Sequence, residues 1–184
     1  HRTKVTDDGL AHLSGLKNLE ELDLEGELIK GSGLVHLRGL HSLKILRITR
    51  VPIIDSDLAG LSNLTDLETL KLNTTKITDA GLSHLSQLKQ LRRLELARAG
   101  GITDAGLSHL TELNELESLY LNGSKITDEG LMTLCSMRQL GTIQVHNTQI
   151  TDAGLEQFAM KRPEINIRPT PPRQREATTS DADD

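Results

Sequence analysis

Apolar residues recur along this chain at fixed spacings, and the whole pattern returns about every 24 residues. Within each unit the apolar positions step by three residues and finally by two, as in Leu82, Leu85, Leu88, Leu91, Leu94 and Leu96. Side chains three apart lie along one face of a short helix, whereas side chains two apart lie on one face of a strand. The pattern therefore predicts that each unit folds as a helix, a turn and a strand.

The repeat keeps its register along the chain. Six full units begin at Val5, Ile29, Ile53, Ile77, Ile102 and Ile126, and a partial unit begins at Ile150. Each interval is 24 residues, except that 25 residues separate Ile77 from Ile102, where Gly100 and Gly101 lie. One unit has too little apolar surface to fold alone, so we expect the units to stack with leucine over leucine. We predict a repeat array over residues 1–167, closed by a capping element from residue 150.

The two ends of the chain differ from the array. The segment Thr3-Lys4-Val5 copies Thr75-Lys76-Ile77, which predicts that the sequence is a fragment cut inside a longer array. Residues 168–184 contain three prolines and many polar residues, and we expect this tail to be disordered. No segment approaches the roughly 18 apolar residues of a membrane span, so no membrane insertion is expected. Localisation stays open between cytoplasmic and secreted.

The strand segments 67–72, 91–96 and 116–121 resemble the strand signature of the leucine-rich repeat family. The motif Ile-Thr-Asp-x-Gly-Leu, at 77–82, 102–107, 126–131 and 150–155, resembles the cysteine-containing subclass found in F-box substrate receptors and many bacterial proteins. The resemblance implies an α/β fold, a right-handed solenoid shaped as a horseshoe arc, with a parallel sheet on the concave face and short helices on the convex face. Where the subclass carries Cys or Asn, this chain has Glu27, Val51, Thr75, Ala99, Ser124 and Thr148, which favours a bacterial protein.

Two further columns of residues accompany each helix. An aspartate precedes the helix at Asp7, Asp55, Asp79, Asp104, Asp128 and Asp152, where a carboxylate can accept hydrogen bonds from free amide groups. Glycine follows two residues later at Gly9, Gly33, Gly81, Gly106, Gly130 and Gly154, and we expect close approach of the adjacent repeat there. Asp57 interrupts the glycine column, so an irregular helix is expected in the third repeat, with Pro52 removing an amide donor before it.

Residues that alternate with the buried leucines of each strand point to the concave face. A partner lying across the strands would meet an acidic end (Glu20, Glu21, Asp23, Glu25 and Glu27), a mostly basic middle (Arg47, Arg50, Lys71, Arg93 and Arg98) and a neutral polar end. The predicted partner-binding residues are Asp23, Arg47, Lys71, Arg93, Glu95, Tyr120, Asn122, Gln144 and His146. The alternative is that these charges pair with one another across neighbouring strands. Tyr120 is the strongest candidate, because a lone exposed aromatic residue often anchors a partner.

Other chemistry finds little support in the sequence. The histidines His12, His36, His84 and His109 occupy one helix position, but neighbouring helices lie about 8–10 Å apart, too far for the four ligands of a stable zinc site. The single Cys135 is expected to pack in the core. No nucleophile and base form a known catalytic motif, and no cofactor is expected. A net charge of -5 gives no support to nucleic-acid binding.

Two functional hypotheses follow. The first is a non-catalytic, monomeric interaction module that binds a protein or peptide on its concave face. The second is the substrate-recognition arm of a larger multidomain protein, such as an F-box-type ubiquitin-ligase adaptor or a kinase-linked receptor, whose other domain lies outside this sequence.

Overall fold

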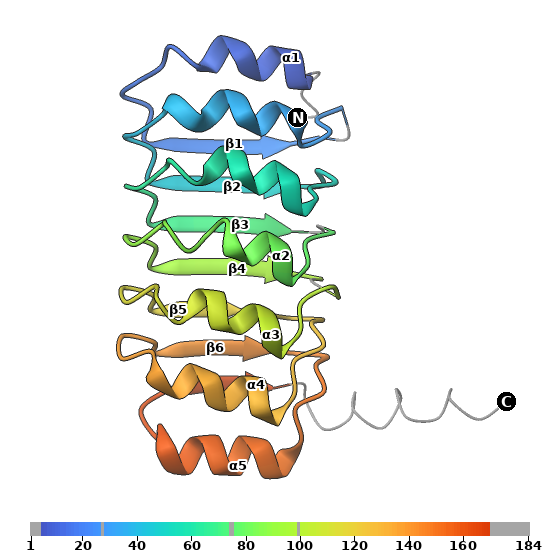
Figure 1. The fold of residues 1–184 in the computed structure, drawn as a ribbon, viewed down its shortest axis with the longest axis vertical. Coiled ribbons are helices and arrows are strands. Elements are labelled where there is room, and N and C mark those ends of the chain that lie inside the picture. Colours follow the sequence, from blue (N-terminus) through green and yellow to red (C-terminus); the bar gives the residue numbers. More distant parts are fainter. Residues whose placement is uncertain (1–4, 27, 74–75, 99, 170–184) are drawn as a thin grey trace, which may run out of the picture.

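The computed structural model describes residues 5–26, 28–73, 76–98 and 100–169. They form a stack of coils in two layers, with strands along one side and short helices along the other (Figure 1). One parallel sheet contains the strands in chain order: β1 Glu21–Glu25, β2 Ile45–Thr49, β3 Thr69–Asn73, β4 Arg93–Ala97, β5 Ser118–Tyr120, β6 Thr142–Val145 and β7 Asn166–Pro169. The predicted α/β leucine-rich repeat solenoid is confirmed. The tail predicted to be disordered lies, apart from Arg168 and Pro169, outside the described residues.

The register of the sheet follows the sequence repeat. Glu21 pairs with Ile45, Ile45 with Thr69 and Thr69 with Arg93, each one repeat further along the chain. The extra residue of the fourth unit is accommodated after β4, where Gly101 forms an isolated bridge with Thr78. The first two columns predicted from the sequence are therefore in register across the whole sheet, and the third is in register as far as Ala97 on β4.

The helical layer consists of short segments, several of them 3₁₀ helices. The first coil contains α1 Asp7–Leu10 and η1 Ala11–Leu13, and the next two contain η2 Ser32–Gly39 and η3 Asp55–Leu61. The later coils contain α2 Asp79–Ser83, then α3 Asp104–Leu107 with η4 Ser108–Leu110, α4 Asp128–Thr133 with η5 Leu134–Ser136, and α5 Asp152–Lys161. The irregular helix that was expected in the third coil, because Asp57 interrupts the glycine column, is the 3₁₀ helix η3. The helical segment of the second coil, η2, is also a 3₁₀ helix.

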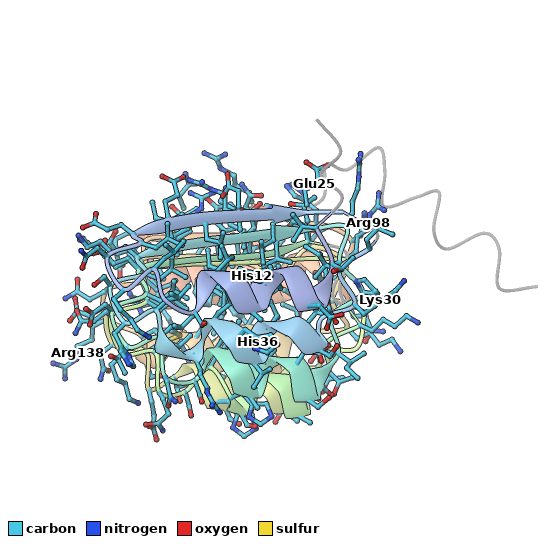
Figure 2. All side chains as sticks on the ribbon, turned by 90° about the horizontal axis from the view of Figure 1, so that it is seen from above. His12, Glu25, Lys30, His36, Arg98 and Arg138 are labelled. Carbon is cyan, nitrogen blue, oxygen red and sulfur yellow. The ribbon has the colours of Figure 1, made fainter. Side chains whose placement is uncertain are left out.

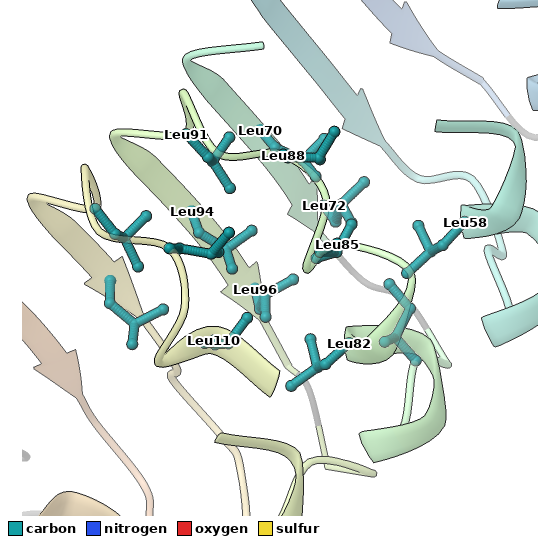
Figure 3. Packing of buried hydrophobic residues seen from close by; sticks show 14 of the residues in the cluster. Leu58, Leu70, Leu72, Leu82, Leu85, Leu88, Leu91, Leu94, Leu96 and Leu110 are labelled. Carbon is teal, nitrogen blue, oxygen red and sulfur yellow. The ribbon is translucent and has the colours of Figure 1, made fainter. Parts of the chain in front are cut away.

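Leucine side chains fill the space between the two layers. The six leucines of the fourth coil, from Leu82 to Leu96, have no exposed surface, and their equivalents in the second and third coils are equally buried (Figure 3). Each fully buried leucine stabilises the fold by about 1.5–3 kcal/mol relative to an exposed one. The first coil is less covered, because Val5 is 37% and Leu16 49% exposed. The core is thus a continuous column, in which each coil packs on its neighbours.

The aspartate column links one coil to the next. In α2 the N-cap is Thr78, and Asp79 is the first helical residue. Asp79 Oδ1 accepts a hydrogen bond from the Thr103 amide of the following coil at 2.8 Å, and Asp79 Oδ2 accepts one from the Thr103 hydroxyl at 2.6 Å. The same pair of bonds joins Asp55 to Thr78, Asp104 to Thr127 and Asp128 to Thr151. These carboxylates accept hydrogen bonds from amide groups, as expected, but each amide belongs to the next coil and not to the helix that the aspartate begins.

The glycine column leaves room for these carboxylates. A Cβ atom at Gly106 would lie 2.3 Å from Asp79 Oδ1, and one at Gly130 would lie 2.0 Å from Asp104 Oδ1. Real atoms do not approach so closely, so a side chain at either glycine would displace the carboxylate. The predicted close approach of the adjacent repeat is confirmed.

The second and third coils exchange the two residues of this junction. Gly31 of the second coil stands where the other coils have aspartate, and Asp57 of the third coil stands where they have glycine. The carboxylate at this junction therefore comes from the later coil and not from the earlier one. Asp57 Oδ2 accepts a hydrogen bond from the Ile54 amide at 3.0 Å, which is the amide that the missing aspartate would have bound. A Cβ atom at Gly31 would lie 2.3 Å from Asp57 Oδ2, and Gly31 has a φ of 98°. The exchange keeps one carboxylate and one glycine at this junction.

The side-chain ladder typical of the cysteine-containing subclass is weak in this chain. The Ser124 side chain is buried and its Oγ has no hydrogen-bond partner among the described residues, while the Thr148 hydroxyl donates to the Val145 carbonyl of its own coil at 3.0 Å. Glu27, Thr75 and Ala99 lie outside the described residues. In this part of the structure the leucines, the hydrogen bonds of the sheet and the aspartate column join the coils in place of that ladder.

The last coil, predicted to be a cap, consists of α5 and β7. Phe158 of α5 is fully buried, and the Arg162 guanidinium donates to the carbonyl oxygens of Cys135 at 2.8 Å and Met137 at 3.1 Å. A polar side chain therefore satisfies backbone groups at this end of the stack. Strand β7 includes Arg168 and Pro169, two residues beyond the predicted end of the array.

Candidate binding face

The strands present one face to the helices and the other to solvent. We call the second one the sheet face, and Figure 2 shows it as the edge of the molecule opposite the helices that carry His12 and His36. Its residues stand in three columns across the strands: Glu21, Ile45, Thr69, Arg93, Ser118, Thr142 and Asn166; then Asp23, Arg47, Lys71, Glu95, Tyr120, Gln144 and Arg168; then Glu25, Thr49, Asn73 and Ala97. Asn122 and His146, which the sequence repeat assigns to the third column, lie just beyond the ends of β5 and β6. Of the nine residues predicted to bind a partner, seven belong to the strands of this face, and Asn122 and His146 lie just beyond two of those strands.

The first strand supplies the acidic end of the sheet face. Glu21, Asp23 and Glu25 of β1 are all exposed. The Arg47 guanidinium on β2 donates to Glu21 Oε1, and to Asp23 Oδ1 at 2.9 Å. The hydrogen bonds from Arg47 to Glu21 and to Asp23 raise the pKa of the guanidinium above its ordinary value. Two carboxylates thus share one cation.

A second charged group occupies the middle of the sheet face. Glu95 Oε2 lies 3.1 Å from Lys71 Nζ and 3.5 Å from Arg93 Nη2, so one carboxylate is shared by two cations. The Arg93 guanidinium also lies over the Tyr120 ring, 4.4 Å from its centroid, which is a cation–π contact. The side chains of Lys71 and Glu95 are 28% and 22% exposed. This group is therefore held in place on both sides, by an ion pair and by an aromatic ring.

The polar end of the sheet face is partly occupied by its own hydrogen bonds. Asn122 Oδ1 accepts from the His146 amide at 2.9 Å, and Asn122 Nδ2 donates to Gln144 Oε1 at 3.4 Å. Asn122 lies two residues beyond the end of β5, so its side chain continues the link between coils after the strand ends. Asn122 therefore has a structural role here in addition to the binding role predicted for it.

Two residues of the predicted basic band lie away from the centre of the sheet. Arg50 and Arg98 directly follow the strands β2 and β4, with φ angles of 60° and 59°. Figure 2 shows Arg98 and Glu25 near the edge where the strands end. Arg50 Nη1 lies 3.1 Å from Glu25 Oε1. The sheet face itself carries Arg47, Lys71 and Arg93 from that band. Arg47 and Lys71 pair with carboxylates of neighbouring strands, as the alternative interpretation describes, whereas Arg93 pairs with Glu95 of its own strand.

Sequence reasoning missed Arg168. It pairs in register with Gln144 and extends the column of Tyr120 to β7, where its side chain is exposed. Arg168 stands 18 residues after the start of its repeat, as Tyr120 and Gln144 do, so counting positions could have found it. The prolines that follow it instead indicated a tail.

The other candidate sites do not assemble. Among the residues that the structure describes, no three His, Cys, Asp or Glu side chains are grouped so as to hold a metal ion. Cys135 is half-buried and packs against the leucine core. None of the described helices has the length and apolar character needed to cross a membrane.

Comparison with known proteins agrees with the geometry. A family model described as a leucine-rich repeat matches residues 115–135. The solved structures that resemble the chain include an internalin C2 from Listeria monocytogenes, with a TM-score of 0.69 and 27% identity over 88% of this chain and 66% of that one. They also include another internalin of the same organism, with a TM-score of 0.61 and 26% identity over 90% of this chain and 51% of that one.

No match was found among proteins with curated descriptions. The chain spans less than two thirds of the length of either internalin, at 66% and 51%. The family model and the two internalin structures together support a leucine-rich repeat family for this chain.

Proposed function

We propose that this chain is a non-catalytic protein-interaction module that binds a protein or peptide partner on its sheet face. The leucine-rich repeat fold and its internalin-like neighbours support an interaction module in general. The coils use the opposite face of each strand for the core, so the sheet face is free to contact a partner without disturbing the stack. Recognition on this face would draw on Asp23, Arg47, Lys71, Arg93, Glu95, Tyr120, Asn122, Gln144 and His146, with Arg168 added from β7.

One observation carries this proposal, the stacking of Arg93 on Tyr120. Aromatic residues make up only 1% of the chain, and the other one, Phe158, is buried in the core. Tyr120 is half-buried on the sheet face and its ring is held by a guanidinium. Tyrosine and arginine, with tryptophan, are enriched among the few residues that dominate binding energy at interfaces. A rigid pair of this kind loses little conformational freedom on binding.

The experiment selects binders from a displayed library of random twelve-residue peptides and measures the affinity of the selected peptides. Tyr120→Ala should weaken binding about 30-fold, the effect of losing an anchor worth about 2 kcal/mol. Met160→Ala is the matched control, because Met160 is 81% exposed on α5 and lies off the sheet face. Selected peptides that bind Tyr120→Ala and the wild type equally, and that Arg93→Glu also leaves unaffected, would remove the support for this surface.

The second hypothesis, a recognition arm of a larger protein, stays a prediction. It is compatible with the same binding face, because the coils would recognise the substrate while another domain acted on it. The resemblance to F-box receptors rests on the repeated motif, and the described residues add nothing to it.

A further inference from the structure

The charges on the sheet face are separated along the stack. Strand β1 contributes three carboxylates, Glu21, Asp23 and Glu25, and no cation. The later strands contribute the cations Arg47, Lys71, Arg93 and Arg168 and the single carboxylate Glu95, which gives four positive charges and one negative charge. The face is therefore balanced as a whole, but β1 carries -3 and the strands after it carry +3.

The ion pairs do not cancel this separation locally. In the N-terminal cluster, formed by Glu21, Asp23 and Arg47, two carboxylates share one cation and leave one negative charge. In the central cluster, formed by Lys71, Arg93 and Glu95, two cations share one carboxylate oxygen and leave one positive charge.

The distance between the two clusters fits an extended chain. Asp23 on β1 and Glu95 on β4 stand in the same column, three strands apart. Neighbouring strands are about 4.8 Å apart, which gives about 14 Å across the sheet. In an extended segment, residues four positions apart point to the same side and are separated by about 13 Å. One such segment can therefore place a side chain over each cluster.

We propose, on the basis of the proposed function, that the partner is an extended segment of opposite charge pattern. It carries a lysine or arginine over the N-terminal cluster and an aspartate or glutamate, four positions away, over the central cluster. The basic side chain meets the carboxylates of Glu21 and Asp23, while the acidic side chain lies between Lys71 and Arg93, beside the Tyr120 ring.

The separation of charge argues against a partner of a single sign. An acidic segment laid across the strands would gain from Lys71 and Arg93 but would meet three carboxylates on β1. A basic segment would gain from the three carboxylates on β1 but would meet the cations Lys71 and Arg93. Unfavourable contacts of this kind suppress the wrong partners and fix the direction of binding. The charge pattern therefore selects both the composition of the segment and its position on the sheet.

The experiment sequences the peptides selected by the wild type from the random twelve-residue library. Peptides with opposite charges four positions apart should be enriched over those with the same charges at other spacings. The double variant Lys71→Glu/Arg93→Glu should bind these peptides about tenfold more weakly, as expected for the loss of two exposed ion pairs. The matched control is Lys89→Glu/Arg92→Glu, which makes the same change of charge and breaks the pairs with Glu112 and Glu117, residues that belong to none of the strands.

The outcomes separate this inference from the proposed function. Enrichment of the spaced opposite charges, lost in the sheet-face variant and kept in the control, supports the inference. Peptides that lack the pattern but bind less well to Tyr120→Ala overturn the inference and leave the binding face in place. Peptides that no sheet-face substitution affects, or a library without any enrichment, count against both.

Discussion

Replacing Gly106 by alanine tests how the coils are joined. The new Cβ atom would lie 2.3 Å from Asp79 Oδ1 and 3.0 Å from both Asp79 Cγ and Leu82 Cδ1, so the carboxylate has to move away. The Thr103 amide and hydroxyl would then lose their acceptor. A hydrogen bond to a charged group contributes about 1.5–3 kcal/mol, and this junction is only partly buried, so we take about 3 kcal/mol for the two. Alanine recovers up to about 1 kcal/mol of helix propensity. The free energy of unfolding should fall by about 2 kcal/mol.

The same substitution should behave differently once the carboxylate is gone. Asp79→Ala alone should lower the free energy of unfolding by about 3 kcal/mol, because it removes the same two hydrogen bonds. In that background Gly106→Ala displaces no carboxylate, so its expected effect is close to zero or slightly stabilising. The double variant should therefore be about as stable as Asp79→Ala, instead of about 5 kcal/mol less stable than the wild type as additivity would require.

Urea unfolding followed by far-ultraviolet circular dichroism measures all four proteins of this cycle. Asp8→Ala is the control, because Asp8 also lies in the first turn of a helix but is exposed, and its carboxylate accepts no hydrogen bond from the described residues. It should change stability by less than about 1 kcal/mol, the range of a helix-dipole contribution. Equal effects of Gly106→Ala in the presence and absence of the Asp79 carboxylate would refute the steric account of the glycine column.

Three further predictions concern single junctions. Gly31→Asp should destabilise the fold by at least about 2 kcal/mol, because the new side chain meets Asp57 at a positive φ, and adding Asp57→Gly should recover more than half of the loss in urea unfolding. Arg162→Ala should cost about 3 kcal/mol by leaving carbonyl oxygens without a donor, and Arg162→Lys should cost less, as their melting temperatures would show. Burial raises the pKa of Asp7, but hydrogen bonds from its neighbours, led by Ser32, outweigh it, so the folded-state pKa lies below the ordinary 3.8. The stability from Asp7 is therefore complete above pH 3.8 and lost as the pH falls below it, so urea unfolding of Asp7→Asn should depend less on pH in that acidic range.

The repeat made most of the fold predictable. Equal spacing of the leucines determines both the strand register and the columns of the sheet face, so Asp23, Arg47 and Lys71 could be placed side by side before any coordinates existed. Close approach at the glycine column could be expected for a similar reason, since a residue that weakens a helix in nearly every coil needs a cause common to those coils. The repeat period predicts these contacts because each coil contacts only its neighbours, so equal spacing in the sequence gives equal positions in adjacent coils.

The partners of individual polar groups were harder to predict. The position of Asp79 at a helix start suggested a local cap, yet its acceptor atoms reach a threonine 24 residues away. Similarly, the columns placed Arg93 near Glu95 and Tyr120, but which partner a flexible guanidinium chooses depends on side-chain geometry that no spacing specifies. Arg168 was missed because the proline-rich composition after it outweighed its position in the repeat.

The coils of this chain can be compared with one another, and the comparison separates stability from recognition. Between the second coil and the fifth, the strand positions that face the core hold only Leu or Ile, and nearly every junction keeps one aspartate against one glycine, even where Gly31 and Asp57 exchange places. The central column of the sheet face, in contrast, reads Asp, Arg, Lys, Glu, Tyr, Gln and Arg from Asp23 to Arg168. Stacking requires no particular residue in that column, because its side chains point away from the core. A surface that varies from coil to coil on a backbone that does not vary can present a different charge at each step of about 4.8 Å, which is what recognition of one particular segment requires.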